Sequence, residues 1–215
     1  MPRVRTDTEI ADFRDRLCEA ATRLFAQHGA EGFTMRMLAA EVGCATMTPY
    51  RYFRDKDELL AAVRARAYDR FSEALEAAAR TAGDSRDKSS AVGEAYVRFA
   101  LANREAYRLM FDMRPTEADA RSADLVRAAT RAYDNMTRHV QAMIDEGVLR
   151  GDPAMIGRMF WAAIHGVVQL EMSGVLPPGP NADTLRHEMM RALFIGLNSA
   201  RPRPAGDTSQ NPLKS

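Results

Sequence analysis

Hydrophobic residues recur at helical spacing along almost the whole chain. In residues 8–28 they stand three or four positions apart, at Ile10, Phe13, Leu17, Ala21, Leu24 and Phe25. This spacing places them on one face of an amphipathic helix. Thr6 and Glu9 have the spacing of a capping box at its start, and Gly29 and Gly32 are suited to its end. No segment shows convincing strand alternation, so the sequence predicts an all-α protein.

Two short helices are expected to follow the first one and to complete an N-terminal three-helix head. One begins after Thr34, a good N-cap residue, and ends before Gly43, which favours a break in the helix. The other covers residues 46–53. Pro49 falls in its first turn, where the missing N–H is not needed.

A longer helical body is expected behind this head. Asp152 and Pro153 mark one helix start, and the polar residues 83–90 are expected to form a loop. The predicted helices of the body cover residues 56–81, 91–103, 104–112, 116–146, 153–173 and 182–197. We therefore divide the chain into an N-terminal domain at 1–55, a helical domain at 56–199 and a disordered tail at 200–215.

The composition is that of a soluble, folded protein. Of the 215 residues, 46% are hydrophobic and 27% are charged, and no apolar run is long enough for a membrane span. The N-terminus lacks the apolar stretch of a secretory signal, so a cytoplasmic location is expected, and Cys18 and Cys44 are expected to be buried thiols. The net charge is only +1, so the chain lacks the excess positive charge of a globally basic nucleic-acid binder, and any such affinity would have to come from the placement of individual basic side chains.

Residues 46–53 carry residue types that suit a DNA groove. Two short helices joined by a glycine turn have the outline of a helix-turn-helix, in which the last helix enters the major groove. Hydroxyl, phenol and guanidinium groups reach base edges and phosphates. The candidates on this helix are Thr46, Met47, Thr48, Tyr50, Arg51 and Tyr52. The alternative is a small helical hairpin with no role in DNA binding.

The stretch from Phe33 to Leu60 resembles the head of the TetR (tetracycline-repressor) family of bacterial regulators. Its most specific part is the pattern Tyr-x-Tyr-Phe-x-x-Lys-x-x-Leu that begins at Tyr50, and the resemblance covers about residues 10–60. The resemblance assigns the DNA backbone to Thr34, Arg36, Tyr50, Tyr52 and Lys56. It assigns the bases to Thr46, Met47, Thr48 and Arg51. The sequence departs from the family pattern at Ala45, usually Ser, and at Pro49, usually Leu or another apolar residue.

The sequence Trp-Ala-Ala-Ile-His-Gly at residues 161–166 resembles a C-terminal domain type of the same family that is marked by Trp, His and Gly. Trp161 and His165 lie one helical turn apart, and Gly166 would let another helix approach closely. Two interpretations stay open, because these side chains either pack in a core or dimer contact or line a ligand pocket. Methionines suit both settings. The candidates for ligand binding are Met110, Met136, Met159, Trp161 and His165.

Motifs for catalysis, cofactor binding or metal binding are not found in the sequence. The four histidines show no ligand spacing, and neither a nucleophile elbow nor a phosphate-binding glycine loop occurs. We therefore expect a protein that is not an enzyme and that has no cofactor and no metal.

The family resemblance implies a homodimer in which the last two helices of each chain form a four-helix bundle. The predicted function is repression at a palindromic operator of double-stranded DNA, with the two reading helices roughly 34–36 Å apart. An unknown small-molecule effector, bound in the helical body, would release the DNA. One alternative is an architectural or protein-interaction DNA-binding protein without a ligand. A second alternative is an enzyme, but the sequence lacks the paired acid–base groups that would support catalysis.

Overall fold

The computed structural model describes residues 6–199, and all regular elements in this range are helices. They are α1 (Asp7–Gly32), α2 (Met35–Val42), the 3₁₀-helix η1 (Pro49–Arg51), α3 (Lys56–Thr81), α4 (Ser85–Ala102), α5 (Arg104–Phe111), α6 (Glu117–Arg121), α7 (Ala123–Asp145), α8 (Pro153–Ser173) and α9 (Ala182–Ser199). The predicted all-α fold is confirmed. The tail expected at 200–215 lies outside the described residues.

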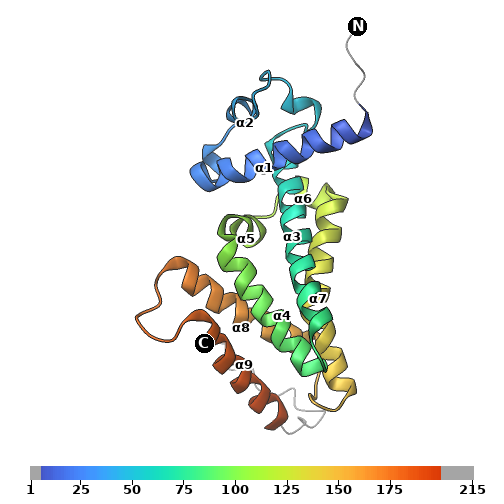
Figure 1. Cartoon of the computed structure of the whole chain (residues 1–215), viewed down its shortest axis with the longest axis vertical. Helices are drawn as coiled ribbons and strands as arrows, with labels where there is room; N and C mark the ends of the chain where they lie inside the picture. Colours follow the sequence, from blue (N-terminus) through green and yellow to red (C-terminus); the bar gives the residue numbers. More distant parts are fainter. Residues whose placement is uncertain (1–5, 200–215) are drawn as a thin grey trace, which may run out of the picture.

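The helices form an elongated molecule with a small head at one end (Figure 1). α1, α2 and η1 make up the head. The long helix α3 leads from the head into the body, where it packs mainly against α7 and α4. α8 packs on α7 and α4, and α9 packs on α8. Head and body are therefore joined by one continuous helix.

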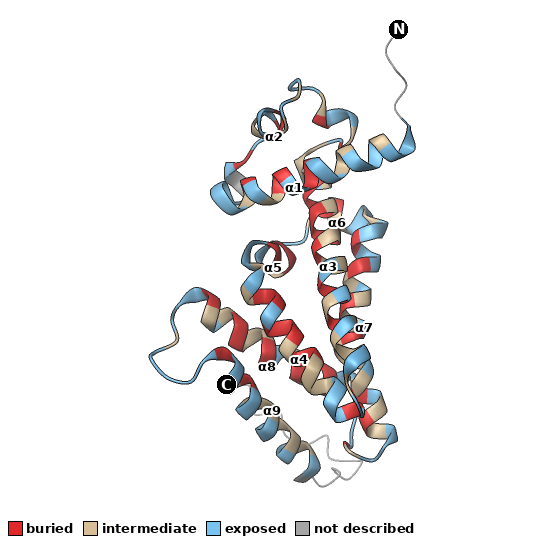
Figure 2. Ribbon diagram, in the orientation of Figure 1, coloured by how far each residue is buried: buried red, intermediate tan, exposed pale blue. Residues whose placement is uncertain are grey.

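Separate clusters of buried side chains hold the head and the body. Figure 2 marks buried residues in red in both parts. The head cluster combines α1 and α2 with Phe53, the first turns of α3 and Leu109 of α5. The body cluster includes the next residue, Met110, together with Phe71 and Tyr96. α5 thus contributes adjacent residues to both clusters, and this ties the head to the body.

Side-chain caps fix several predicted helix ends. The hydroxyl of Thr6 accepts a hydrogen bond from the N–H of Glu9 at 3.2 Å, and the Glu9 carboxylate accepts one from the N–H of Thr6 at 2.9 Å. The predicted capping box is therefore present. At the start of α8, Asp152 caps the helix and Pro153 is its first residue. Gly43 ends α2 with a φ of 72°, a left-handed conformation that costs glycine little.

Residues 46–53 differ from the short α-helix that the sequence predicts. Residues 46–48 form a turn, and only Pro49–Arg51 is helical, with 3₁₀ geometry. Proline has no N–H to donate to a preceding turn, and its ring conflicts with the carbonyl four residues earlier. The helix therefore starts at Pro49 and not at residue 46.

Two boundaries in the body also differ from the predicted ones. α4 begins at Ser85, inside the expected loop, because Asp84 accepts hydrogen bonds from two backbone N–H groups of its first turn. The single helix expected over 116–146 is divided into α6 and α7. The chain is extended at Ser122, and its side chain accepts from the N–H of Leu125 at 3.3 Å to start α7.

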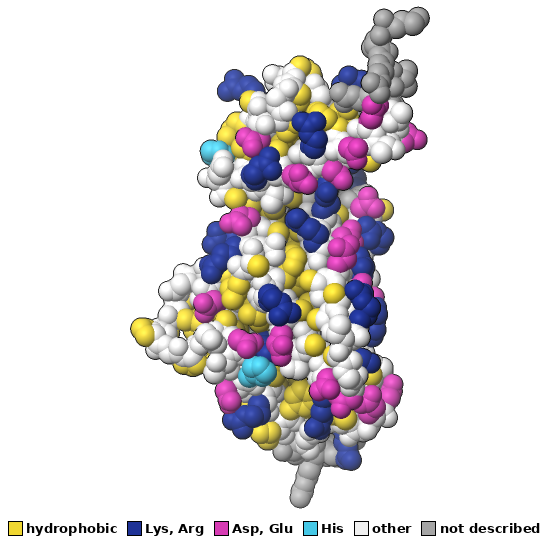
Figure 3. All heavy atoms as spheres, viewed as in Figure 1, with side chains coloured by type: hydrophobic (Ala, Val, Ile, Leu, Met, Phe, Trp, Pro, Cys, Tyr) yellow, Lys and Arg dark blue, Asp and Glu magenta, His cyan; other side chains and the backbone are white. Residues whose placement is uncertain are grey.

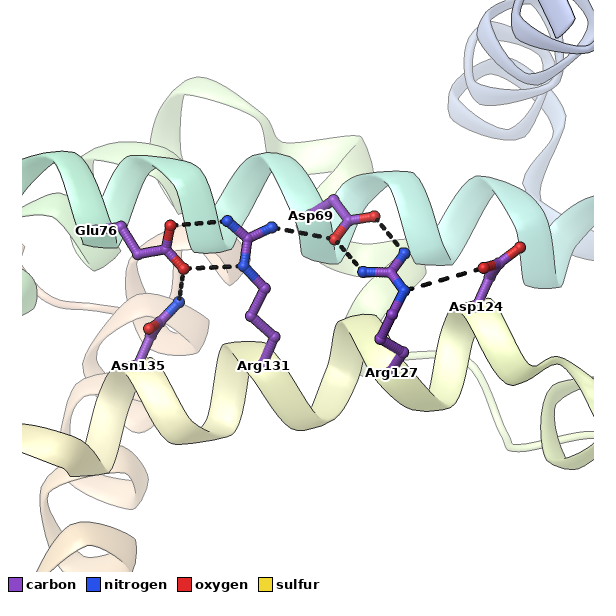
Figure 4. A network of polar contacts seen from close by, with 6 residues as sticks. All are labelled: Asp69, Glu76, Asp124, Arg127, Arg131 and Asn135. Carbon is purple, nitrogen blue, oxygen red and sulfur yellow. Dashed lines mark hydrogen bonds and ion pairs between the residues drawn. The ribbon is translucent and has the colours of Figure 1, made fainter.

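A network of charged side chains links α3 to α7 (Figure 4). Arg131 donates to the two carboxylate oxygens of Glu76 at 2.8 and 2.7 Å and to Asp69 at 3.3 Å. Arg127 donates to Asp69 at 3.1 and 3.0 Å, and Asn135 donates to Glu76 at 2.8 Å. The hydrogen bonds from Arg131 and Asn135 lower the pKa of Glu76 to about 2. These charge-assisted bonds hold the two helices side by side.

Candidate functional site

α2, a glycine turn and η1 form a helix-turn-helix in the head. Thr34 caps α2 by accepting a hydrogen bond from a backbone N–H of the first turn at 3.2 Å. Gly43 reverses the chain, and the N–H of Thr48 donates to the carbonyl of Ala45 at 2.8 Å in the turn that precedes η1. Thr34 and Arg36, which are expected to meet the DNA backbone, are both exposed.

The segment around η1 presents most of the expected base-reading side chains to solvent. Pro49 is buried and Phe53 is only 1% exposed, so the segment is anchored from its inner side. Thr48 is half-buried. The exposed side chains are those of Thr46, Met47, Tyr50 and Arg51. Met47 is 68% exposed, which leaves an apolar group free to contact a thymine methyl.

Tyr52 and Lys56 make contacts inside the head. The Tyr52 ring packs on Phe13, with ring centroids 4.9 Å apart. Lys56 Nζ donates to the carbonyl of Phe33 at 3.1 Å, so it crosses from α3 to the start of the helix-turn-helix. Arg14 donates to the carbonyl of Tyr52 at 2.5 Å. The sequence gives no signal for this Arg14 contact, because 38 residues separate the two positions and no local pattern pairs them.

Basic and acidic side chains are interspersed on the face of the head that Figure 3 shows. This distribution agrees with the near-zero net charge of the whole chain. DNA binding by this head would depend on a few placed side chains and not on a broad basic surface.

A cavity of about 560 Å³ lies in the body between α4, α7, α8 and α9. Its volume is typical of small-molecule sites. Much of its wall is apolar and is formed by Met136, Phe160, Trp161, Ile164, Met190 and Phe194. Arginines and histidines supply polar groups, and among the described residues no Asp or Glu lines it. Burial lowers the pKa of the lining His139 to about 4, so this ring is uncharged near neutral pH.

A hydrogen-bonded cluster of aromatic side chains adjoins the cavity. Trp161 Nε1 donates to the Tyr96 hydroxyl at 3.3 Å, and this hydroxyl lies 2.8 Å from that of Tyr107. The Tyr107 hydroxyl lies 2.6 Å from Nδ1 of His165. Burial raises the pKa of both tyrosines and lowers the pKa of His165. The cluster is therefore neutral, and Trp161 and Tyr96 belong both to it and to the cavity wall.

The structure separates the five residues expected at a ligand. Met136 and Trp161 line the cavity. His165 lies in the aromatic cluster, and Met110 is 2% exposed within the body core. Met159 is half-buried on α8 and is not part of the lining. The wall formed by α9 is absent from the sequence prediction, because an apolar helix face does not reveal whether it meets a core or a cavity.

Close helix packing along α8 occurs at Gly157 and not at Gly166. A Cβ on Gly157 would lie 2.6 Å from Cγ2 of Thr137 on α7. At Gly166, no atom lies within 4 Å of the corresponding position. The close helix approach expected at Gly166 is therefore not made within one chain.

Cys18 is buried, as predicted, whereas Cys44 in the turn after α2 is half-buried. Within residues 6–199, no helix is long and apolar enough to cross a membrane. The same range holds no group of three or more His, Cys, Asp or Glu side chains placed to bind a metal ion.

Comparison with protein families gives two matches along the chain. The family described as bacterial regulatory proteins, tetR family, matches residues 17–63. The family described as tetracyclin repressor-like, C-terminal domain, matches residues 89–193. The first range contains the helix-turn-helix, and the second contains most of the cavity wall.

The proteins that are similar to the chain include a transcriptional repressor and a transcriptional activator. The HTH-type transcriptional repressor AcnR of Corynebacterium diphtheriae is 36% identical over 72 residues, which are 34% of this chain and 38% of that protein. The HTH-type transcriptional activator FasR of Mycolicibacterium smegmatis is 31% identical over 99 residues, 46% of this chain and 45% of that protein. The chain thus spans less than half the length of these relatives. A solved structure of a protein with unknown function from Rhodococcus sp. RHA1 has a TM-score of 0.77 at 28% identity, covering 92% of this chain and 98% of that one.

Proposed function

Because the chain belongs to the TetR family of bacterial regulatory proteins, we propose that it is a homodimeric transcriptional repressor that a small molecule releases from its operator. The main support for the proposal is that one chain contains both an exposed segment at residues 46–53, called the reading segment, and a cavity large enough for a small molecule. Residues 1–55 would bind DNA, and residues 56–199 would bind the effector and the second chain. The site of action would be the cytoplasm.

In the proposed complex, the η1 segment lies in the major groove. The base edges would be read by Thr46, Met47, Thr48 and Arg51. The phosphates and sugars would be held by Thr34, Arg36, Tyr50, Tyr52 and Lys56. Lys56 has three N–H donors, so one bond to Phe33 leaves others for a phosphate. A symmetric dimer would place its two segments roughly 34–36 Å apart on a palindromic operator.

The dimer would form through α8 and α9, paired with the same helices of a second chain. Both helices leave large apolar side chains in solvent, with Leu170 of α8 43% exposed and Ile195 of α9 56% exposed. Val175, just after α8, is 65% exposed. A four-helix bundle between two chains would remove these side chains from water, which favours association.

α5 offers a physical connection between the cavity and the head. The ring centroid of Phe111 lies 6.2 Å from that of Trp161 and 5.1 Å from that of His165. On the same helix, Leu109 is 0% exposed within the head cluster. A ligand that displaces Trp161 would shift α5 against the head and alter the spacing of the two reading segments. Coupling through packed side chains of this kind needs two arrangements of the same element.

DNA reading is tested with sequences selected from random double-stranded DNA by the purified protein. In gel-shift titrations, Arg51→Ala should bind the selected sequence about ten- to a hundred-fold more weakly, because each lost base contact costs roughly 1–3 kcal/mol. Arg80→Ala changes an exposed arginine at the end of α3 and serves as the matched control. Equal affinities of Arg51→Ala and the unsubstituted protein (the parent) for the selected DNA would contradict the assignment of base reading to residues 46–53.

The direction of regulation is tested with a reporter gene placed behind the selected sequence. Co-expression of the protein is expected to lower reporter output, and Arg51→Ala is expected to restore it. A rise in output with the parent protein would contradict repression and identify an activator. DNA bending without any change in output would favour an architectural role.

A further inference from the structure

Arg186 is a buried arginine in the wall of the cavity. It is 1% exposed and comes from the first half of α9. Its Nε and Nη2 donate to Oδ1 of Asp183 at 3.1 and 2.9 Å, and Nη2 also donates to Nε2 of His187 at 2.8 Å. The Glu94 carboxylate lies 3.7 Å from Nη2. These contacts hold the guanidinium in one orientation.

The remaining nitrogen, Nη1, has no hydrogen-bond partner among the residues the structure describes. It lies beside Gly93 of α4, where a Cβ would be 3.2 Å from Nη1 and 3.5 Å from Cδ1 of Ile164. Arginine presents five N–H donors in a fixed geometry. Within residues 6–199 the fully buried side-chain atoms without a partner are Arg64 Nε and Ser72 Oγ, so Nη1 of Arg186 keeps contact with solvent. An acceptor bound in the cavity would therefore receive a hydrogen bond from Nη1.

The rest of the cavity defines the other end of such a ligand. Phe160, Trp161 and Phe194 form an aromatic wall that suits an apolar body. The carboxylates near Arg186 contact its Nε and Nη2, and none of the carboxylates within residues 6–199 lines the cavity itself. Arg86 and Arg191 add positive charges to the lining. Arg191 pairs with Glu188, whereas Arg86 has no ion-pair partner within residues 6–199.

We propose that the cavity binds amphipathic monocarboxylates, whose carboxylate accepts hydrogen bonds from Nη1 of Arg186 while the apolar body packs on the aromatic wall. This inference rests on the proposed function, because it names the chemical class of the effector. Charge-assisted hydrogen bonds to a preoriented guanidinium are stronger than neutral ones. The site should therefore discriminate an acid from a neutral molecule of the same length.

The test uses three probes of one chain length: decanoate, decan-1-ol and decylammonium. Isothermal titration of the full chain should show decanoate binding about tenfold or more tightly than decan-1-ol, since hydrogen bonds to charged groups are stronger than those between neutral groups. Decylammonium should bind most weakly. Arg186→Met keeps an unbranched side chain but removes the donors, and it should abolish the preference for the acid.

Two further variants distinguish loss of the hydrogen bond from Nη1 of Arg186 from a general effect of substitution on folding. Gly93→Ala places a Cβ against Nη1 and should weaken decanoate binding more than decan-1-ol binding. Arg158→Met changes an exposed arginine of α8 that is not part of the lining, and it should leave the preference intact. Thermal melting by circular dichroism verifies that each variant is folded.

Equal affinities for decanoate and decan-1-ol would overturn the proposal. So would an unchanged preference in folded Arg186→Met, or the absence of decanoate binding. DNA binding in the absence of any probe is measured separately by gel shift. Loss of sequence-selective DNA binding alongside intact decanoate binding would contradict the proposed function and leave the ligand assignment standing.

Discussion

Gly157 and Gly166 lie on the same helix but have different surroundings. Gly157→Ala should lower the free energy of unfolding by about 1–3 kcal/mol, because its new methyl group would collide with Thr137 on α7. Gly166→Ala should raise it by roughly 0.5–1 kcal/mol, because open space receives the methyl group and alanine favours the helix. Urea unfolding followed by circular dichroism measures both. Destabilisation by Gly166→Ala would show that a second chain packs at this position.

Residue types predicted which side chains of the reading segment are exposed, but not how that segment is held. Thr46, Met47 and Arg51 are in solvent, as their position after a glycine turn indicates. The bond from Lys56 to a carbonyl before α2, and the bond from Arg14 to a carbonyl after η1, join elements distant in sequence. Contacts of this kind depend on the packing of α1 and α3, which periodicity does not determine.

The network between α3 and α7 makes stability depend on pH. The folded-state pKa of Glu76 is about 2, below its ordinary 4.5, so the ionised carboxylate stabilises the fold above pH 4.5. This contribution is lost as the pH falls from 4.5 toward 2. Glu76→Gln should lower the free energy of unfolding by about 1 kcal/mol at neutral pH. The effect is small because solvent screens the charges of this partly exposed network. The difference between the variant and the unsubstituted protein should shrink as the pH falls from 4.5 toward 2.

Urea unfolding at several pH values measures this effect of Glu76. Glu73→Gln is the matched control, since Glu73 is an exposed carboxylate of the same helix outside the network. The control should follow the parent at every pH. A difference between Glu76→Gln and the parent that stays constant down to pH 2 would contradict the assignment of this bond pattern.

Whole helices were predictable where periodicity and a cap agreed. The start of α1 at its capping box and the start of α8 at Asp152 and Pro153 are confirmed. Asp84 was hidden in a polar run that resembled a loop, so the early start of α4 was missed. Ser122 lies within a segment whose hydrophobic residues keep helical spacing throughout. At this position the side chain of Ser122 can cap a new helix, and this cap competes with continuation of the preceding helix. Such competition is decided by tertiary packing.

Assembly of the molecule is tested by placing a charge on each of two exposed apolar positions. Leu170→Glu, on α8, should convert the dimer to a monomer, because burying a carboxylate in an apolar bundle is costly. Val126→Glu, on α7, changes a residue that is 52% exposed outside the proposed interface and should leave the dimer intact. Light scattering of the purified proteins measures their masses. A monomeric parent, or a dimer that survives Leu170→Glu, would place the interface elsewhere.

In the proposed mechanism, binding of a ligand in the cavity is coupled to binding of DNA, and the fluorescence of Trp161 reports on this coupling. Trp161 is the only tryptophan of the chain and lines the cavity. The compound that most raises the melting temperature in a metabolite screen is titrated with and without the selected DNA. By reciprocity, its affinity should be roughly 5- to 150-fold weaker on the DNA-bound protein. Equal affinities in the two titrations would contradict ligand-controlled release, because such a ligand shifts no equilibrium.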